Sequence, residues 1–183
     1  MKKESTVVYF LRLTVTLLLI CGIVAAVLAG VNTITKDKIA AIQEQKTLDA
    51  IAEVLPGVEG LEEMTLSGDT GIVKSAYASE EGYAVEVAPI GFDGEVMLMV
   101  GITSRGEVTG ISVISHTETP GLGAVAAAKN QRGEAFRGQF VGQSGSLAVG
   151  ENVDAISGAT ITSKAVTEGV NAALAFVAKN FGG

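Results

Sequence analysis

The residues of this sequence best suited to chemistry form a cluster of small and hydroxyl-bearing side chains at residues 154–166, DAISGATITSKAV. Apolar residues then recur at helical spacing and predict a helix from about residue 161 to about residue 180: Ile161, Val166, Val170, Leu174 and Val177. Residues 157–160 therefore fall at or just before a helix N-terminus, where free backbone N–H groups and the helix dipole attract anions such as phosphate. Gly158 and Ala159 leave this backbone open to close approach.

A simpler interpretation assigns the same residues to helix capping. Serine and threonine are common N-cap residues, so Ser157 or Thr160 would cap the helix while Gly158 serves a turn. On these four residues alone, the cap is the favoured interpretation. A binding function therefore needs support from the rest of the sequence.

A second polar segment, SHTETPGLGA at residues 115–124, contains the single histidine of the chain. Pro120 restricts the backbone while Gly121 and Gly123 permit conformations closed to other residues, so a tight loop here can press against a flat ring. His116 and Glu118 have the chemistry of an acid–base pair. We nevertheless interpret His116 as a structural residue at a strand end, and we predict neither a catalytic side chain nor a metal site.

Cysteine usage limits the redox chemistry. The single cysteine, Cys21, lies in an apolar run, so the chain has no intrachain disulfide, no all-cysteine iron–sulfur cluster and no cysteine-rich zinc site. Without a Cys-x-x-Cys-His segment there is no c-type haem attachment. A redox protein of this composition would use an organic carrier.

The N-terminal region differs sharply from the rest. Residues 13–35 contain no charged side chain, and as a helix they would be about 35 Å long, enough for a hydrocarbon layer of about 30 Å. A cleaved signal peptide is the alternative, but its apolar region is usually only about 7–15 residues long. We predict an uncleaved transmembrane helix at residues 13–35, a cytoplasmic segment at residues 1–12 bearing Lys2, Lys3 and Arg12, and an extracytoplasmic remainder.

The remaining residues predict an α+β fold. Residues 36–57 have the pattern of an amphipathic stalk helix, either continuous with the membrane helix or separated from it by a break near residues 33–36. Within the predicted domain at residues 58–183, residues 58–69 are expected to be a connection. Four strand-like segments then form an antiparallel meander, a short helix follows at about residues 123–130, and the helix after Thr160 completes the domain. The strand-like segments are IVKSAYAS, YAVEVAPIGF, EVMLMVGIT and VTGISVISH.

The charge distribution narrows the range of partners. The chain has 20 acidic and 13 basic residues, a net charge of −7, and no basic run after the membrane segment. An acidic surface of this kind is a poor match for nucleic acid or for anionic lipid headgroups.

Two motifs in the expected order resemble those of the FMN-binding domain family. The pattern Asp-x-x-Ser-Gly-Ala-Thr at residues 154–160 resembles the motif of proteins that carry FMN through a phosphodiester to threonine, and residues 115–124 resemble the second signature of the domain. With one membrane helix and an acidic outer domain, the chain is similar over nearly its whole length to the G subunits of Rnf-type electron-transport complexes. The C subunits of sodium-pumping NADH:quinone reductases are related to them.

The resemblance implies roles for individual residues. Thr160 would be esterified with FMN by a flavin transferase, and Asp154 would serve recognition of the motif. Ser157, Gly158 and Ala159 would give access to the phosphate. The remaining cofactor-binding residues would lie at the helix N-terminus (Ile161, Thr162, Ser163 and Lys164) or border the flavin ring (Glu118, Thr119, Gly121 and Leu122).

The resemblance also implies a function. The chain would relay electrons through covalent FMN within an inner-membrane complex that exchanges electrons between ferredoxin and NAD and moves Na⁺ or H⁺. Its partners would be the other subunits of the complex, and it would not be catalytic alone. Two alternatives remain: a membrane-anchored, non-redox module that binds a phosphorylated or anionic ligand at the same helix terminus, and a separate flavin reductase, which is disfavoured because the sequence has no dinucleotide-binding fingerprint.

Overall fold

The computed structural model describes residues 6–58, 60–66 and 70–181. Lys2 and Lys3, which carry part of the predicted topology, and Asp69, the end of the predicted connection, lie outside the described residues. The described chain divides into two compact units, Met1–Gln45 and Lys46–Gly183, and each is described by itself.

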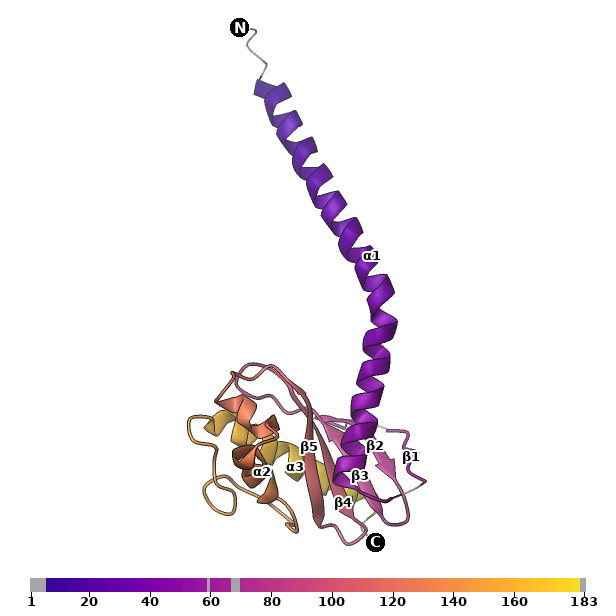
Figure 1. Ribbon diagram of the computed structural model, residues 1–183, viewed down its shortest axis with the longest axis vertical. Helices are drawn as coiled ribbons and strands as arrows, with labels where there is room; N and C mark the ends of the chain where they lie inside the picture. Colours follow the sequence, from indigo (N-terminus) through magenta and orange to yellow (C-terminus); the bar gives the residue numbers. More distant parts are fainter. Residues whose placement is uncertain (1–5, 59, 67–69, 182–183) are drawn as a thin grey trace. The chain divides into compact units, whose positions relative to one another are not determined.

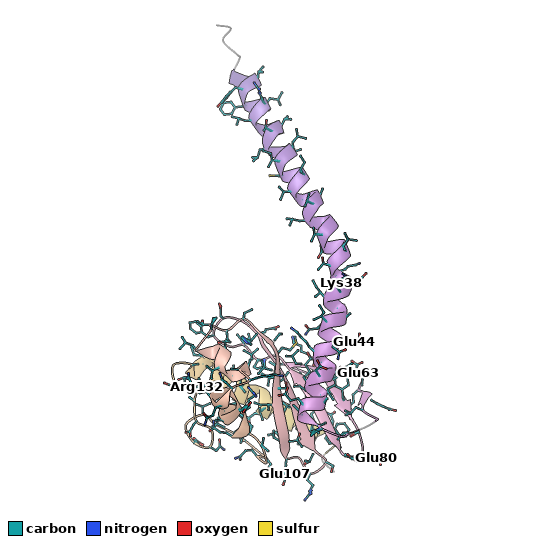
Figure 2. All side chains as sticks on the ribbon, in the orientation of Figure 1. Lys38, Glu44, Glu63, Glu80, Glu107 and Arg132 are labelled. Atoms are coloured by element: carbon teal, nitrogen blue, oxygen red, sulfur yellow. The ribbon has the colours of Figure 1, made fainter. Side chains whose placement is uncertain are left out.

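The first unit is the greater part of a single helix, α1, which spans Thr6–Val54. Its apolar segment is long enough to cross a membrane, and its side chains are exposed around the helix (Figure 2). The hydroxyl groups of Thr14, Thr16 and Thr33 donate to the carbonyl groups of Phe10, Arg12 and Ala29, four residues earlier. These bonds satisfy three hydroxyl groups of the apolar run within the helix itself. The helix shows no interruption at residues 33–36, so the two predicted segments are continuous.

The second unit is built on a five-stranded antiparallel sheet in the order β1-β2-β3-β4-β5 (Figure 1). The strands are β1 (Glu62–Glu63), β2 (Val73–Ala78), β3 (Gly82–Val87), β4 (Val96–Thr103) and β5 (Val108–His116). The predicted meander is confirmed for β2 to β5. The two-residue strand β1, which pairs with β2, lies inside the segment expected to be a connection.

The register of the last hairpin brings the chemically interesting segments together. Val96, the first residue of β4, pairs with His116, the last residue of β5. The loop before β4 and the segment after β5 therefore leave the sheet at the same end. Glu80 and Glu107, labelled in Figure 2, lie in the turns before β3 and β5, at the opposite end of these strands.

Strand alternation gives the sheet two buried faces. One face packs against α3 (Thr160–Phe181) and α2 (Gln131–Gly138). The core on this face includes Leu98 and Val100 of β4 and Phe140, which follows α2. The C-terminal end of α1 covers the other face, where Val54 packs with Met99. The α+β fold class is confirmed, with helices on both faces of the sheet (Figure 1).

The connection between β5 and α3 differs from the prediction. The expected short helix at residues 123–130 is a 3₁₀ helix, η1, at Gly123–Ala127, and an unpredicted helix, α2, follows it. Asn130 separates the two, because its side-chain oxygen accepts hydrogen bonds from the N–H groups of Arg132 and Gly133 and so caps α2. The helix predicted at about residues 161–180 is α3, longer by one residue at each end.

Candidate functional site

Thr160 is the first residue of α3 and follows a tight turn. The Ala159 N–H donates to the carbonyl of Ile156 across 2.9 Å, and Gly158, the third residue of this turn, has φ +79°. A positive φ at that position is typical of a type II turn and favours glycine. The sequence Ser-Gly-Ala therefore ends the preceding chain sharply and presents Thr160 at the start of the helix.

Ser163 holds this turn against the helix from inside. Its fully buried hydroxyl accepts a hydrogen bond from the Ile156 N–H at 2.9 Å and donates one to the Ala159 carbonyl at 2.9 Å. Ser163 was expected near the phosphate, whereas its side chain is engaged with the backbone of the turn. Its contribution to the site is therefore the shape of the turn before Thr160.

The N-terminus of α3 has no side-chain cap among the described residues. Within that part of the chain, neither Ser157 nor Thr160 makes a side-chain hydrogen bond there, and the N–H groups of Thr160, Ile161 and Thr162 meet no protein acceptor. The capping interpretation of Ser157 and Thr160 is therefore not the arrangement adopted. Free N–H groups beside an exposed hydroxyl suit a covalently attached or bound anion.

The segment after β5 forms a second turn of the same kind. The Leu122 N–H donates to the Thr119 carbonyl at 3.2 Å, with Pro120 and Gly121 (φ +79°) between them. Proline and glycine at these two positions favour a type II turn. His116 is the final residue of β5, and its Nδ1 accepts a hydrogen bond from the Glu118 N–H at 3.2 Å, which agrees with a structural role.

Glu118 connects three parts of the site, although it is only 5% exposed. Its Oε1 accepts hydrogen bonds from the N–H groups of Phe92 at 2.7 Å and Asp93 at 3.2 Å. Its Oε2 accepts one from the hydroxyl of Thr162 at 2.5 Å. The carboxylate therefore joins the loop before β4 to the first turn of α3.

These elements enclose a cavity of about 340 Å³, within the range of about 300–1,000 Å³ typical of small-molecule sites. Eight of the predicted cofactor-binding residues line it: Glu118, Thr119, Leu122, Gly158, Ala159, Thr160, Ile161 and Thr162. Gly123 also lines it, as does Phe92, which was not among the predicted residues. A phenylalanine next to a glycine in a loop is an ordinary feature, and its place here depends on contacts distant in sequence.

The remaining predicted residues lie outside this cavity. Ser157 and Asp154 line a neighbouring cavity of about 470 Å³, and the backbone of Asp154 exchanges two hydrogen bonds with the side chain of Gln139. Lys164 is exposed on another side of α3. Gly121 and Ser163 do not line the cavity, and shape its two turns instead.

A further cavity, of about 530 Å³, lies elsewhere, between the C-terminal part of α3 and the turn before β5. Tyr83 and Phe181 stack there with ring centroids 4.2 Å apart. No predicted site residue lines it. Among the described residues, no group of three or more His, Cys, Asp or Glu side chains is arranged to hold a metal ion.

Comparison with known proteins gives consistent results for both units. Residues 91–175 match the model of the FMN-binding domain, and residues 6–54 match that of the RnfG N-terminal region. The chain is 33% identical over 185 residues to the G subunit of the ion-translocating oxidoreductase complex of Methanosarcina acetivorans, covering 93% of this chain and 96% of that protein. It is 34% identical to the G subunit of the Na⁺-translocating ferredoxin:NAD⁺ oxidoreductase complex of Acetobacterium woodii, covering 87% of each. The proton-translocating counterpart from Clostridium ljungdahlii is 32% identical over the full length of both chains.

Proposed function

Because the chain belongs to the family of G subunits of ion-translocating oxidoreductase complexes, we propose that it carries electrons through FMN attached covalently to Thr160. It does so as one subunit of a membrane-bound ferredoxin:NAD⁺ oxidoreductase. Its maturation requires a flavin transferase that moves the FMN phosphoryl group from a flavin dinucleotide to the Thr160 hydroxyl. The P–O bond to threonine forms as the diphosphate bond of the donor breaks and a nucleoside monophosphate leaves.

One observation carries the assignment to Thr160: an exposed hydroxyl without a partner in the described chain stands on the cavity wall at an uncapped helix N-terminus. The N–H groups of Thr160, Ile161 and Thr162 are available to the phosphodiester charge, which the helix dipole also favours. Gly158 has no side chain to obstruct this position. A cap would have engaged the threonine oxygen with the backbone instead.

The apolar part of the cavity fits the rest of the cofactor. Leu122 and Ile161 supply apolar surface for a flat ring, and the turn at residues 119–122 forms one side of the site. Bound FMN supplies the one- and two-electron chemistry of the isoalloxazine. The protein residues hold and orient the cofactor, and none of them is required to transfer a proton.

The helix α1 anchors this domain to the membrane. We propose that residues 1–12 are cytoplasmic and that the FMN domain is extracytoplasmic, because basic residues accumulate on the cytoplasmic side of membrane helices. Relatives are named as Na⁺-translocating and as proton-translocating, so either ion is compatible with this family. One membrane helix provides no transport pathway by itself, and the pathway belongs to the other subunits.

The test is the mass of the peptide that contains Thr160, from protein co-expressed with a flavin transferase. Wild-type protein should carry one FMN on Thr160 and give a fluorescent band after denaturing electrophoresis. Thr160→Ala should insert and fold but give no such band, because the ester oxygen is lost. The matched control is Ser144→Ala, which removes an exposed hydroxyl outside the motif and should leave the attachment in place.

Two results would contradict the proposal. Unmodified Thr160 in wild-type protein would favour the non-redox module with a reversible anionic ligand. FMN found on Ser157, Thr162 or Ser163 would place the attachment on another residue of the same motif.

A further inference from the structure

Exposed apolar side chains gather around the site. Phe92 is 68%, Ile161 53% and Leu122 46% exposed, and all three line the same cavity. They come from three separate segments: the loop before β4, the first turn of α3 and the turn after β5. Large apolar side chains that converge on one concave surface indicate that a largely apolar ligand covers them.

Phe92 owes its position to Glu118, 26 residues later in the sequence. The carboxylate accepts hydrogen bonds from the Phe92 and Asp93 N–H groups, and the Thr117 hydroxyl donates to the Asp93 carbonyl at 2.5 Å. Two consecutive residues just after β5, Thr117 and Glu118, therefore fix the backbone of the loop on both sides of Asp93. The aromatic ring itself remains outside these contacts and lines the cavity.

Two glycines make room for the carboxylate. A Cβ atom on Gly91 would collide with Oε1 of Glu118, and one on Gly123 would collide with Oε2. A Cβ on Gly123 would also lie 2.6 Å from the Thr162 hydroxyl oxygen. Residues 91 and 123 therefore have no room for a side chain while Glu118 occupies this position.

The carboxylate acts as an acceptor in this arrangement. It receives three hydrogen bonds and forms no ion pair with any residue that the structure describes. Both oxygens are engaged by protein donors, and the side chain is buried. Its role is thus geometric: it sets the distance between the Phe92 loop and the N-terminus of α3.

We infer that Phe92 packs against the isoalloxazine of the attached FMN and that Glu118 is the positioning residue that holds Phe92 there. This inference rests on the proposed function, because it requires the flavin to occupy this cavity. It adds a third apolar wall, which neither of the two motifs contains. Aromatic side chains prefer offset-stacked or edge-to-face contact with another ring, so Phe92 changes the surroundings of the flavin and its exposure to solvent.

The experiment uses the full chain, flavinylated at Thr160, and measures flavin emission, its quenching by iodide and the midpoint potential. Phe92→Ala should raise iodide quenching and shift the emission and the potential, whereas Phe92→Tyr should restore wild-type behaviour. Glu118→Ala should resemble Phe92→Ala. Glu118→Gln should stay near wild type in quenching, because its amide oxygen can accept from both N–H groups and its NH₂ can donate to Thr162. Val141→Ala is the matched control, since Val141 is 53% exposed and lines none of the cavities described above.

The outcomes separate this inference from the proposed function. Fully labelled Phe92→Ala protein with wild-type emission, quenching and potential would overturn it, as would Phe92→Ala protein that is folded but not labelled. A wild-type response in Glu118→Ala, together with a changed Phe92→Ala, would remove the positioning role of Glu118. Absence of covalent FMN from the wild-type chain would instead contradict the proposed function itself.

Discussion

At the scale of single residues, two glycines with the same backbone conformation have different surroundings. Gly121 and Gly158 both have φ +79°. A Cβ on Gly121 would meet no atom within 4 Å, whereas one on Gly158 would lie 3.1 Å from Cδ2 of Leu122. The backbone requirement is therefore the same at both positions, but only Gly158 is in contact with the cavity wall.

This difference predicts separate effects for two alanine substitutions. Each should lower the free energy of unfolding by about 1–2 kcal/mol, the usual cost of placing an L-residue in the left-handed region. Only Gly158→Ala should also displace Leu122 and change the emission of bound flavin. Urea unfolding of the full chain in detergent, followed by circular dichroism, measures the first effect, and fluorescence measures the second. A changed flavin spectrum in Gly121→Ala with an unchanged one in Gly158→Ala would contradict this account.

The sequence predicts the part of the site that is local. The residues around Thr160 lie within one turn and one helix start, so spacing and glycine content are enough to place them. Phe92 could not be predicted in this way, because its position depends on hydrogen bonds to Glu118, which is remote in sequence. Ser163 was predicted to contact the ligand because it carries a hydroxyl near Thr160. That hydroxyl is instead buried and bonded to the backbone of the turn.

At the scale of elements, the join between α1 and the sheet depends on two paired glycines. Gly101 of β4 pairs with Gly110 of β5, and both face the end of α1. A Cβ on Gly101 would lie 2.6 Å from the Val54 carbonyl oxygen and would also collide with the Thr109 hydroxyl, which donates to that carbonyl at 2.6 Å. A Cβ on Gly110 would meet Val54 at an ordinary 3.7 Å.

We therefore expect Gly101→Ala to force the end of α1 away from the sheet and to cost about 1–3 kcal/mol of stability, as overpacking usually does. Gly110→Ala is the matched control and should change stability by less than Gly101→Ala. Hydrogen exchange at residues 50–55 should rise in the first variant only. Equal losses of stability in the two variants would show that strand pairing, and not contact with α1, determines the effect.

Prediction of the elements succeeded where the pattern was regular. In β2 to β5 and in α3, apolar residues recur at regular spacing, because one face of each element is buried in the core between the sheet and α3. The helix α2 has the sequence QRGEAFRG, with two glycines and little apolar periodicity. Its formation depends on the Asn130 cap and on Phe136, which is buried against Phe140 at a centroid distance of 5.5 Å. Tertiary packing therefore overrides weak local propensity in this segment.

At the scale of the whole molecule, the prediction that matters most is the side of the membrane on which Thr160 lies. With Cys21→Ala as background, Val141→Cys should react with a membrane-impermeant thiol reagent in intact cells, since Val141 is exposed. Lys3→Cys should react only after lysis. The opposite pattern would reverse the proposed orientation and would place the flavin in the cytoplasm.

The packing of Val54 and its neighbours against the sheet determines where a protease could cut the domain from its membrane helix without unfolding it. The uncharged segment suited to contact with lipid ends at about residue 35. The part of α1 that is buried against the sheet begins at Ala50. Proteolysis between residues 36 and 45 would liberate a domain with both hydrophobic faces covered. Cleavage after Pro56 would instead expose Ala84, Met99 and Ile114 to water, and the product would tend to aggregate. Shedding of an intact flavin domain is therefore confined to a window of about three helical turns.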